Sequence, residues 1–211
     1  MAGAVLGGRR RSALSYTGVT MRLFVALPLA DRAAQELAEV CGRLRPEAPG
    51  LRWSAPESWH ITLQFLGSSR AEQLDCLTLR LAELGAAPVA VRLGNLGVFA
   101  RAGVFLVEVE RRPELEELQR RVVDATAQCG YAAEARPYHP HITLARAKGD
   151  GRRQLRRIQE RQAGKPAASD STGAGGFTPF TATEFLLYES HLGPGGSKYE
   201  VKARFALNGS A

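Results

Sequence analysis

Short runs of alternating apolar and polar residues recur along the chain, and this pattern is typical of β-strands that are buried on one side. In the run 59–66 the two faces are Ile61, Leu63 and Phe65 on the apolar side and His60, Thr62 and Gln64 on the polar side. Similar runs predict strands over 22–29, 51–54, 89–99, 104–110, 181–188 and 199–207, with a further strand that begins at His141. Most of the expected sheet therefore has one buried face.

Four other segments carry apolar residues at helical spacing, and they predict amphipathic helices. These segments are 31–45, 70–84, 113–129 and 151–162. Asp31 is a plausible N-cap, Pro113 suits a first helical position and Gly130 suits a C-terminal cap. Each half of the chain holds strands and two helices, so we predict an α+β fold of two similar lobes with antiparallel sheets around a central cleft.

The sequence HITL occurs at 60–63 and again at 141–144, and in each copy His and Thr lie two positions apart. On a strand, residues two apart point to the same face. Two such strands facing each other would bring together two imidazoles, which serve as acid and base near neutral pH, and two hydroxyls, which can bind phosphate oxygens. The pattern favours phosphodiester chemistry by His60, His141, Thr62 and Thr143.

Charge and composition agree with a folded domain that binds a polyanion. The 211 residues are 45% hydrophobic, with a net charge of +7 and a sequence pI of about 9.8. Residues 1–20 contain three arginines and no acid, and we expect them to be a disordered or spurious extension before a single domain over 21–208. A signal peptide and a transit peptide are the rival interpretations of this segment. No apolar stretch is long enough to cross a bilayer.

The three cysteines, Cys41, Cys76 and Cys129, are widely spaced and fall on helical patterns. This spacing favours buried thiols in a reducing compartment over a disulfide frame, so we expect a cytoplasmic protein. Residues 165–176 are poor in bulky apolar side chains and predict a mobile loop.

Several residues outside the repeated motif have two interpretations. His139 could chelate a metal together with His141, but no acidic residue lies at ligand spacing, so we expect no metal and no cofactor. His191 precedes a Gly-Pro turn and suits an exposed loop. The basic helix over 151–162 suits either RNA steering or a solvated surface. Nucleobase stacking and core packing are the two alternatives for the aromatic residues Trp53, Phe99 and Tyr138.

With these motifs in place, the chain from Met21 to Asn208 resembles the 2H phosphoesterases. Within them it is most similar to the bacterial and archaeal RNA 2′,3′-cyclic phosphodiesterases, also called 2′-5′ RNA ligases. The segments that carry the resemblance are the opening 22–27, the two motif regions 53–67 and 140–146, and the tail segments 187–190 and 199–201.

The resemblance implies a bilobal fold and hydrolysis of RNA 2′,3′-cyclic phosphate ends to 2′-phosphate ends. His60 would be the proton donor and His141 the proton acceptor, while Thr62 and Thr143 would bind the phosphate. Arg146 matches an arginine often found after the second motif. By strand parity Arg146 points away from His141, so its contact with phosphate requires the strand to end or twist.

Other functions remain compatible with the sequence. The same histidines would serve another cyclic or 2′-5′ linkage, or reversible ligation of RNA, and a basic surface alone would suit a non-catalytic RNA-binding module. We expect the partners to be RNA ends or small cyclic nucleotides, and the protein to be a monomer that does not enter membranes.

Overall fold

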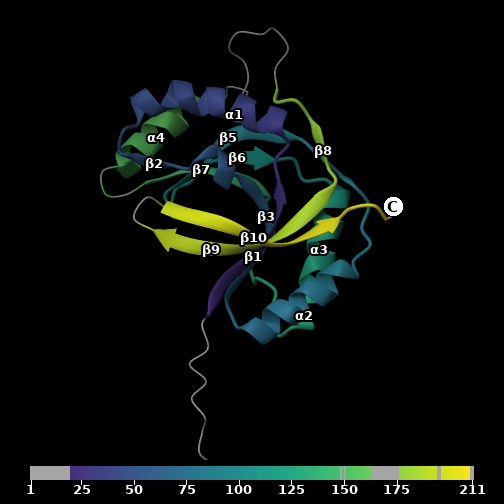
Figure 1. Cartoon of the computed structure of the whole chain (residues 1–211). Coiled ribbons are helices and arrows are strands. Elements are labelled where there is room, and N and C mark those ends of the chain that lie inside the picture. Colours follow the sequence, from purple (N-terminus) through teal and green to yellow (C-terminus); the bar gives the residue numbers. More distant parts are fainter. Residues whose placement is uncertain (1–19, 148, 150, 163–175, 194–195, 210–211) are drawn as a thin grey trace, which may run out of the picture.

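The fold is built on two four-stranded antiparallel sheets (Figure 1). The computed structural model describes residues 20–147, 149, 151–162, 176–193 and 196–209. One sheet, here called the β3 sheet, has the strand order β10-β9-β1-β3, and the other, the β7 sheet, has the order β2-β7-β6-β5. The strands are β1 Met21–Pro28, β2 Leu51–Trp53, β3 His60–Ser69, β4 Val89–Val91, β5 Leu93–Phe99, β6 Val104–Val109, β7 His141–Ala147, β8 Phe180–Ala182, β9 Glu184–Gly193 and β10 Gly196–Ala206.

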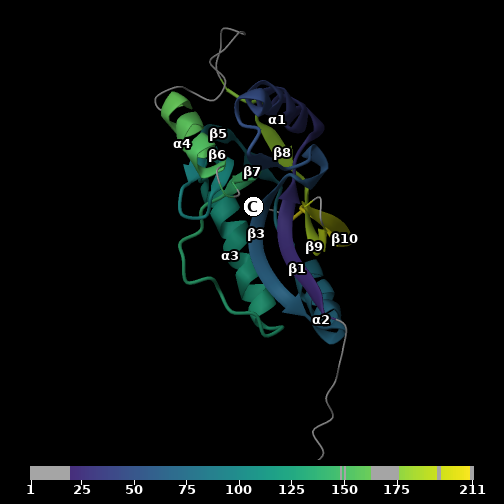
Figure 2. The same cartoon turned by 90° about the vertical axis from the view of Figure 1, so that its left-hand side faces the viewer.

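In the described part of the chain, four α-helices cover the sheets, as the apolar spacing predicts. They are α1 Asp31–Leu44, α2 Ala71–Ala82, α3 Pro113–Ala127 and α4 Gly151–Gln162. Figures 1 and 2 place α1 and α4 at the end of the molecule that holds the β7 sheet, and α2 at the other end beside β1 and β3. The α+β prediction with two antiparallel sheets is confirmed.

Two predicted strands are each divided in the structure. The run 89–99 forms β4 and β5, and the region 181–188 forms β8 and the first part of β9. The reason is that β4 and β8 leave the large sheets and pair with each other as a third, two-stranded sheet. Two short 3-10 helices, Arg45–Glu47 and Pro56–Ser58, occupy the positions where prolines end or interrupt the regular elements.

The two strands that carry the histidines share an irregularity that changes which side chains they present. On β3, Thr62 pairs with Ala26 and Gln64 with Val25, so Leu63 is an extra residue. On β7, Thr143 pairs with Leu106 and Ala145 with Phe105, so Leu144 is the extra one; Leu144 also accepts a hydrogen bond from Ser54 N at 2.8 Å. Each strand therefore has a β-bulge three residues after its histidine, and the alternation of faces shifts by one residue beyond it.

The bulge on β3 corrects the face assignment made from strict alternation. Gln64, expected on the polar face, is buried at 5% exposure, and its Oε1 accepts a hydrogen bond of 2.6 Å from Thr126 Oγ1 on α3. Phe65, expected in the core, is 59% exposed. Strict alternation is wrong here because Leu63 and Gln64 both turn toward the helices behind the sheet.

The cysteine prediction is also wrong in part. Cys76 on α2 and Cys129, just beyond α3, form a disulfide that joins these two helices on the side of the β3 sheet away from the histidines. Cys41 is a free thiol at 1% exposure on α1, and burial raises its pKa to about 12. Only Cys41 fits the expected buried, inert thiol.

Some predictions fall where the structure gives little or no description. Of the expected N-terminal extension only residue 20 is described, and of the expected loop over 165–176 only Gly176. Among the described helices, none is both long and apolar enough to cross a membrane.

Candidate active site

Two half-buried histidines stand at the starts of β3 and β7 in matching environments. His60 Nδ1 lies 2.8 Å from the carbonyl oxygen of Ser58, and His141 Nδ1 lies 2.8 Å from the carbonyl oxygen of His139. A carbonyl oxygen only accepts hydrogen bonds, so Nδ1 is the donor in both rings. When neutral, each imidazole therefore has an unprotonated Nε2 that can take a proton.

The two histidine strands come from different sheets but contact each other. The rings also interact electrostatically. The pKa of His60 is lowered to about 4, mainly by burial and with smaller contributions from the charges of His141 and Arg146, against the hydrogen bond to Ser58 that raises it. Burial likewise lowers the pKa of His141, with His139 and Arg146 acting in the same direction. In the free protein at neutral pH both imidazoles are therefore neutral.

Thr62 and Thr143 lie two residues after the histidines and on the same faces of their sheets. This follows from the register, because Thr62 pairs with Ala26 and Thr143 with Leu106, before the bulge on each strand. Both are half-buried, and neither hydroxyl has a hydrogen-bond partner among the described residues. Two hydroxyl donors thus remain available beside the histidines.

Arg146 lies on the same face as His141 because of the bulge at Leu144. Its cross-strand partner is Val104, which shares a face of β6 with Leu106, the partner of Thr143. The Arg146 charge lowers the pKa of both histidines, which places it within electrostatic reach of the two rings. Parity alone pointed Arg146 away from the site, and the extra residue restores it.

Aromatic side chains surround the His60 ring. The centroid of His60 lies 4.7 Å from Phe24, 5.1 Å from Tyr199 and 6.1 Å from Tyr188. Phe65 follows the bulge on the same face and is next to Phe24, at 6.1 Å between ring centroids. Sequence reasoning missed all four as site residues, although the alternation on 22–27 already put Phe24 on the face opposite the core.

The three candidate stacking residues have different surroundings in the structure. Phe99 packs edge-on against the His141 ring at 4.9 Å and against the His139 ring at 5.1 Å, so it belongs to the site. Trp53 packs against Phe105 and donates a hydrogen bond to Ala48 O at 3.3 Å, which is a core role. Tyr138 is half-buried against the core, and burial raises the pKa of its hydroxyl.

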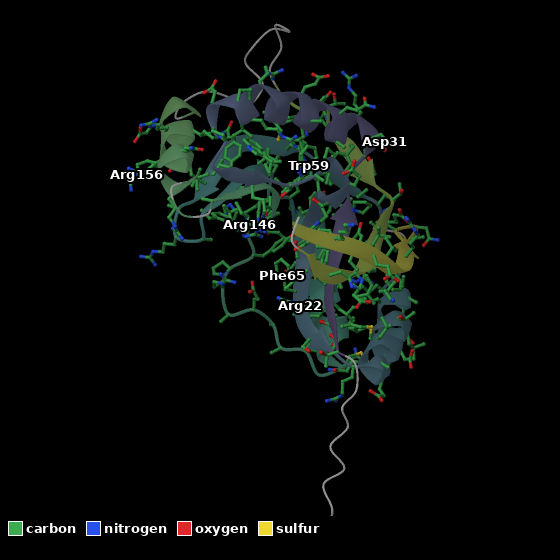
Figure 3. All side chains as sticks on the ribbon, turned by 60° about the vertical axis from the view of Figure 1, so that its left-hand side comes forward. Arg22, Asp31, Trp59, Phe65, Arg146 and Arg156 are labelled. Atoms are coloured by element: carbon green, nitrogen blue, oxygen red, sulfur yellow. A yellow bond between two sulfur atoms is a disulfide. The ribbon has the colours of Figure 1, made fainter. Side chains whose placement is uncertain are left out.

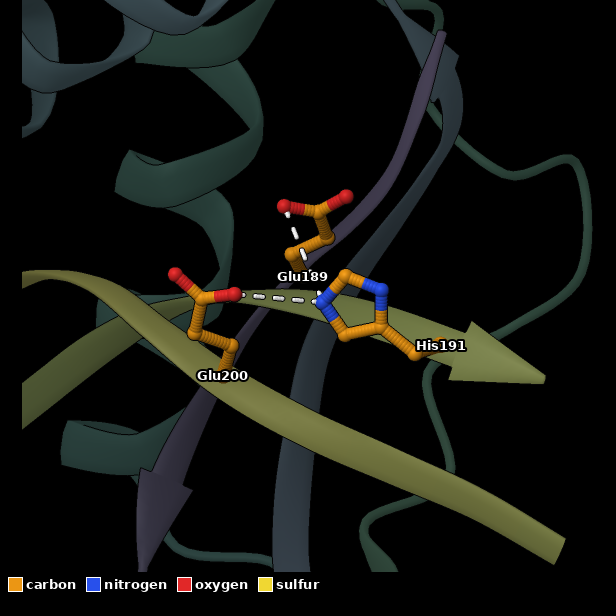
Figure 4. Close-up of side chains that lie close together, drawn as sticks. All are labelled: Glu189, His191 and Glu200. Atoms are coloured by element: carbon orange, nitrogen blue, oxygen red, sulfur yellow. Dashed lines mark hydrogen bonds and ion pairs between the residues drawn. The ribbon is translucent and has the colours of Figure 1, made fainter. Parts of the chain in front are cut away.

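Within the described part of the chain, three potential metal ligands gather only at Glu189, His191 and Glu200 on β9 and β10 (Figure 4). His191 Nε2 lies 3.2 Å from Glu200 Oε2, and Lys202 Nζ lies 3.4 Å from Glu189 and 3.0 Å from Glu200. The lysine supplies the positive charge that these carboxylates need, so the cluster is an ion-pair network. His191 lies on a strand, not in the expected loop, and is exposed as expected.

The basic helix forms as predicted over Gly151–Gln162. Leu155 and Ile158 bury its apolar side, and Arg152 donates a hydrogen bond to Ala100 O at 3.2 Å. Arg156 and Arg157 are exposed (Figure 3 labels Arg156). The helix stays compatible with RNA steering and with a solvated surface.

Because His60 is buried in its neutral form, we expect the free energy of unfolding to fall in acid. Because the pKa of His60 is about 4 in the folded protein and 6.5 in an unfolded chain, the unfolded state binds more protons between these values. From pH 7 to pH 5 the free energy of unfolding should fall by about 2 kcal/mol through this group alone. Urea titrations of wild type and His60→Gln at both pH values measure it, and equal losses in the two proteins would contradict the shift.

Comparisons with known proteins show which family the chain resembles. The profile of the 2′-5′ RNA ligase superfamily matches residues 19–172. An RNA 2′,3′-cyclic phosphodiesterase of Geobacillus stearothermophilus is 32% identical over 193 residues, which are 89% of this chain and 57% of that protein. The enzyme of the same name from Bacillus subtilis is 30% identical, covering 88% of this chain and 96% of the relative. The crystal structure of E. coli LigT complexed with 3′-AMP aligns with a TM-score of 0.71 and 26% identity, over 90% and 99% of the two chains.

Proposed function

Because the chain belongs to the 2′-5′ RNA ligase superfamily, we propose that it is an RNA 2′,3′-cyclic phosphodiesterase that leaves 2′-phosphate ends. The observation that carries the proposal is the matched pair of imidazoles, each with Nδ1 bound to a backbone carbonyl and with no hydrogen-bond partner for Nε2 among the described residues. Relatives over nearly the full chain are named for this activity. Hydrolysis of a cyclic phosphodiester needs one proton acceptor and one proton donor, and the histidine pair supplies both.

The reaction forms one bond and breaks one bond at phosphorus. His141 Nε2 takes a proton from water while the water oxygen bonds to phosphorus, and His60 Nε2 gives a proton to the 3′-oxygen while the P–O3′ bond breaks. The 2′-oxygen keeps the phosphate. The roles of the two rings follow the family resemblance, and the matching hydrogen bonds suit either ring to either role.

Because the pKa of His60 is lowered in the free protein, substrate binding has to favour the protonated ring. A proton donor has to be protonated before the reaction, yet burial holds His60 neutral in the free protein. A phosphate anion beside the ring favours the charged imidazolium and raises its pKa. Substrate binding should therefore favour uptake of a proton from solvent by His60, and the imidazolium then donates that proton to the leaving 3′-oxygen.

Thr62, Thr143 and Arg146 would bind the non-bridging phosphate oxygens. In support of this, Thr62 shares a face of β3 with His60, and Thr143 and Arg146 share a face of β7 with His141. Negative charge on these oxygens grows as water attacks, so fixed donors stabilise the transition state. Each proton transfer has a partner among the side chains, so the proposed mechanism uses no metal.

Terminal analysis of a defined oligonucleotide tests the function. With an RNA that ends in 2′,3′-cyclic phosphate and excess chelator present, we expect conversion to a 2′-phosphate end. A 3′-phosphate product would contradict the assigned leaving oxygen, and loss of turnover in chelator would point to a metal near His139. The same assay with nucleoside 2′,3′-cyclic monophosphates compares RNA ends with small cyclic nucleotides.

A further inference from the structure

An arginine pair lies on the edge of the β7 sheet, beside the histidines. Arg52 on the edge strand β2 and Arg146 on β7 are direct cross-strand partners. Their neighbours Trp53 and Ala145 are likewise paired and pack toward the core. Arg52 and Arg146 therefore project from the opposite face, which is the face of His141 and Thr143 beyond the bulge.

This pairing is unfavourable unless an anion binds to it. Side chains that lie directly opposite on neighbouring strands have Cβ atoms about 5 Å apart, and like charges in that position repel. Both arginines are exposed, and within the described part of the chain neither has a carboxylate ion-pair partner. Glu108 is an acidic residue on the same face of the sheet, but it pairs with His141. It lies four residues beyond Val104, the residue of β6 that pairs with Arg146.

The edge strand holds Arg52 in a fixed place. Ser54 N donates a hydrogen bond of 2.8 Å to the carbonyl oxygen of Leu144, the bulge residue itself. Leu51 is buried at 5% exposure, and the Trp53 indole is anchored on Ala48 O. The residues on both sides of Arg52 are thus tied into the core, so its guanidinium starts from a rigid backbone one strand farther out than Arg146.

We propose that Arg52, together with Arg146, binds a second phosphate group of the substrate, the phosphodiester one nucleotide before the cyclic end. The proposal rests on the proposed function, because it assigns that site an RNA chain as substrate in preference to a mononucleotide. Arg146 shares a face of β7 with His141 and acts electrostatically on both histidines, and Arg52 extends the positive surface by one strand, where the next phosphate would bind. Guanidinium groups suit phosphate because they donate paired hydrogen bonds.

Binding of two product-like ligands tests the arginine pair without requiring turnover. The ligands are a nucleoside 2′-phosphate and a dinucleotide that ends in the same nucleoside 2′-phosphate, titrated calorimetrically. Arg52→Gln should weaken binding of the dinucleotide about tenfold, the effect of losing one charge-assisted hydrogen bond, and leave the mononucleotide unchanged. For the dinucleotide, the slope of the logarithm of the binding constant against the logarithm of the salt concentration should become less steep by about 0.7.

Two further variants distinguish a specific phosphate site from a general effect of positive charge on the protein surface. Arg43→Gln removes another exposed arginine, on α1, and should change neither affinity. Arg52→Lys keeps the charge and should retain part of the preference for the dinucleotide. Equal losses for both ligands, no loss for the dinucleotide, or no binding of either ligand to wild type would overturn the proposal. Binding as expected without hydrolysis of cyclic ends would instead refute the proposed function and leave the phosphate site standing.

Discussion

Replacing His60 or His141 with alanine is expected to lower kcat for a 2′,3′-cyclic phosphate end by 10²- to 10⁴-fold, the usual contribution of one acid or base. Hydrolysis needs a proton acceptor and a proton donor together, so the single ring that remains in either variant can supply only one of the two transfers. The double variant should lose little more than the worse single variant, because the two transfers belong to one step. Rates measured at saturating substrate provide the comparison.

His191→Ala is the matched control for these variants. His191 is exposed on β9 and pairs with Glu200, so its removal should leave kcat within about twofold of wild type. All three variants should remain folded at pH 7 in urea titrations, with some loss of stability in His60→Ala because the ring packs against Phe24 and Tyr199. If either His60→Ala or His141→Ala turned over at the wild-type rate, that ring would have no part in the chemistry.

Removing the disulfide should lower the free energy of unfolding by about 4 kcal/mol without a comparable effect on kcat. Cys76 and Cys129 are 53 residues apart in sequence, and closing a loop of that length restricts the unfolded chain strongly. The bridge joins α2 to the end of α3 behind the β3 sheet, away from the histidines. Urea titration of wild type with and without reductant, and of a Cys76→Ala, Cys129→Ala variant, measures the loss.

The Cys76→Ala, Cys129→Ala variant also serves as the control for the effect of reductant. It should unfold at one urea concentration in both conditions, because Cys41 is buried and unpaired. An unfolding midpoint that does not change between oxidised wild type, reduced wild type and the variant would show that the bridge adds nothing to stability. A large fall in kcat on reduction would show that the helices behind the sheet hold the site in shape.

Sequence reasoning predicted the elements well and failed where a strand departs from strict alternation. The apolar periods of α1 to α4 were sufficient to locate the helices, and the repeated His and Thr lie on two strands that contact each other. The bulges at Leu63 and Leu144 have no marker such as glycine, and they arise because two successive residues both pack toward the core. Alternation alone therefore placed Phe65 in the core and turned Arg146 away.

Contacts between segments that are distant in sequence could not be predicted, for a different reason. The bond between Cys76 and Cys129 depends on how two helices pack against the same sheet, which no local pattern encodes. The pairing of Arg52 with Arg146 depends on the register of β2, a strand of three residues. Registers of such short strands are fixed by their neighbours in space.

The two bulges make the fifth residue after each histidine equivalent in the two halves of the site. In one half this residue is the exposed Phe65, and in the other it is Arg146 (Figure 3). The imidazole, the hydroxyl two residues later and the carbonyl hydrogen bond are duplicated in the two halves. A ligand could enter such a near-symmetric centre in two orientations. Its direction is therefore decided outside the duplicated part, where one half offers a flat apolar ring and the other a cation.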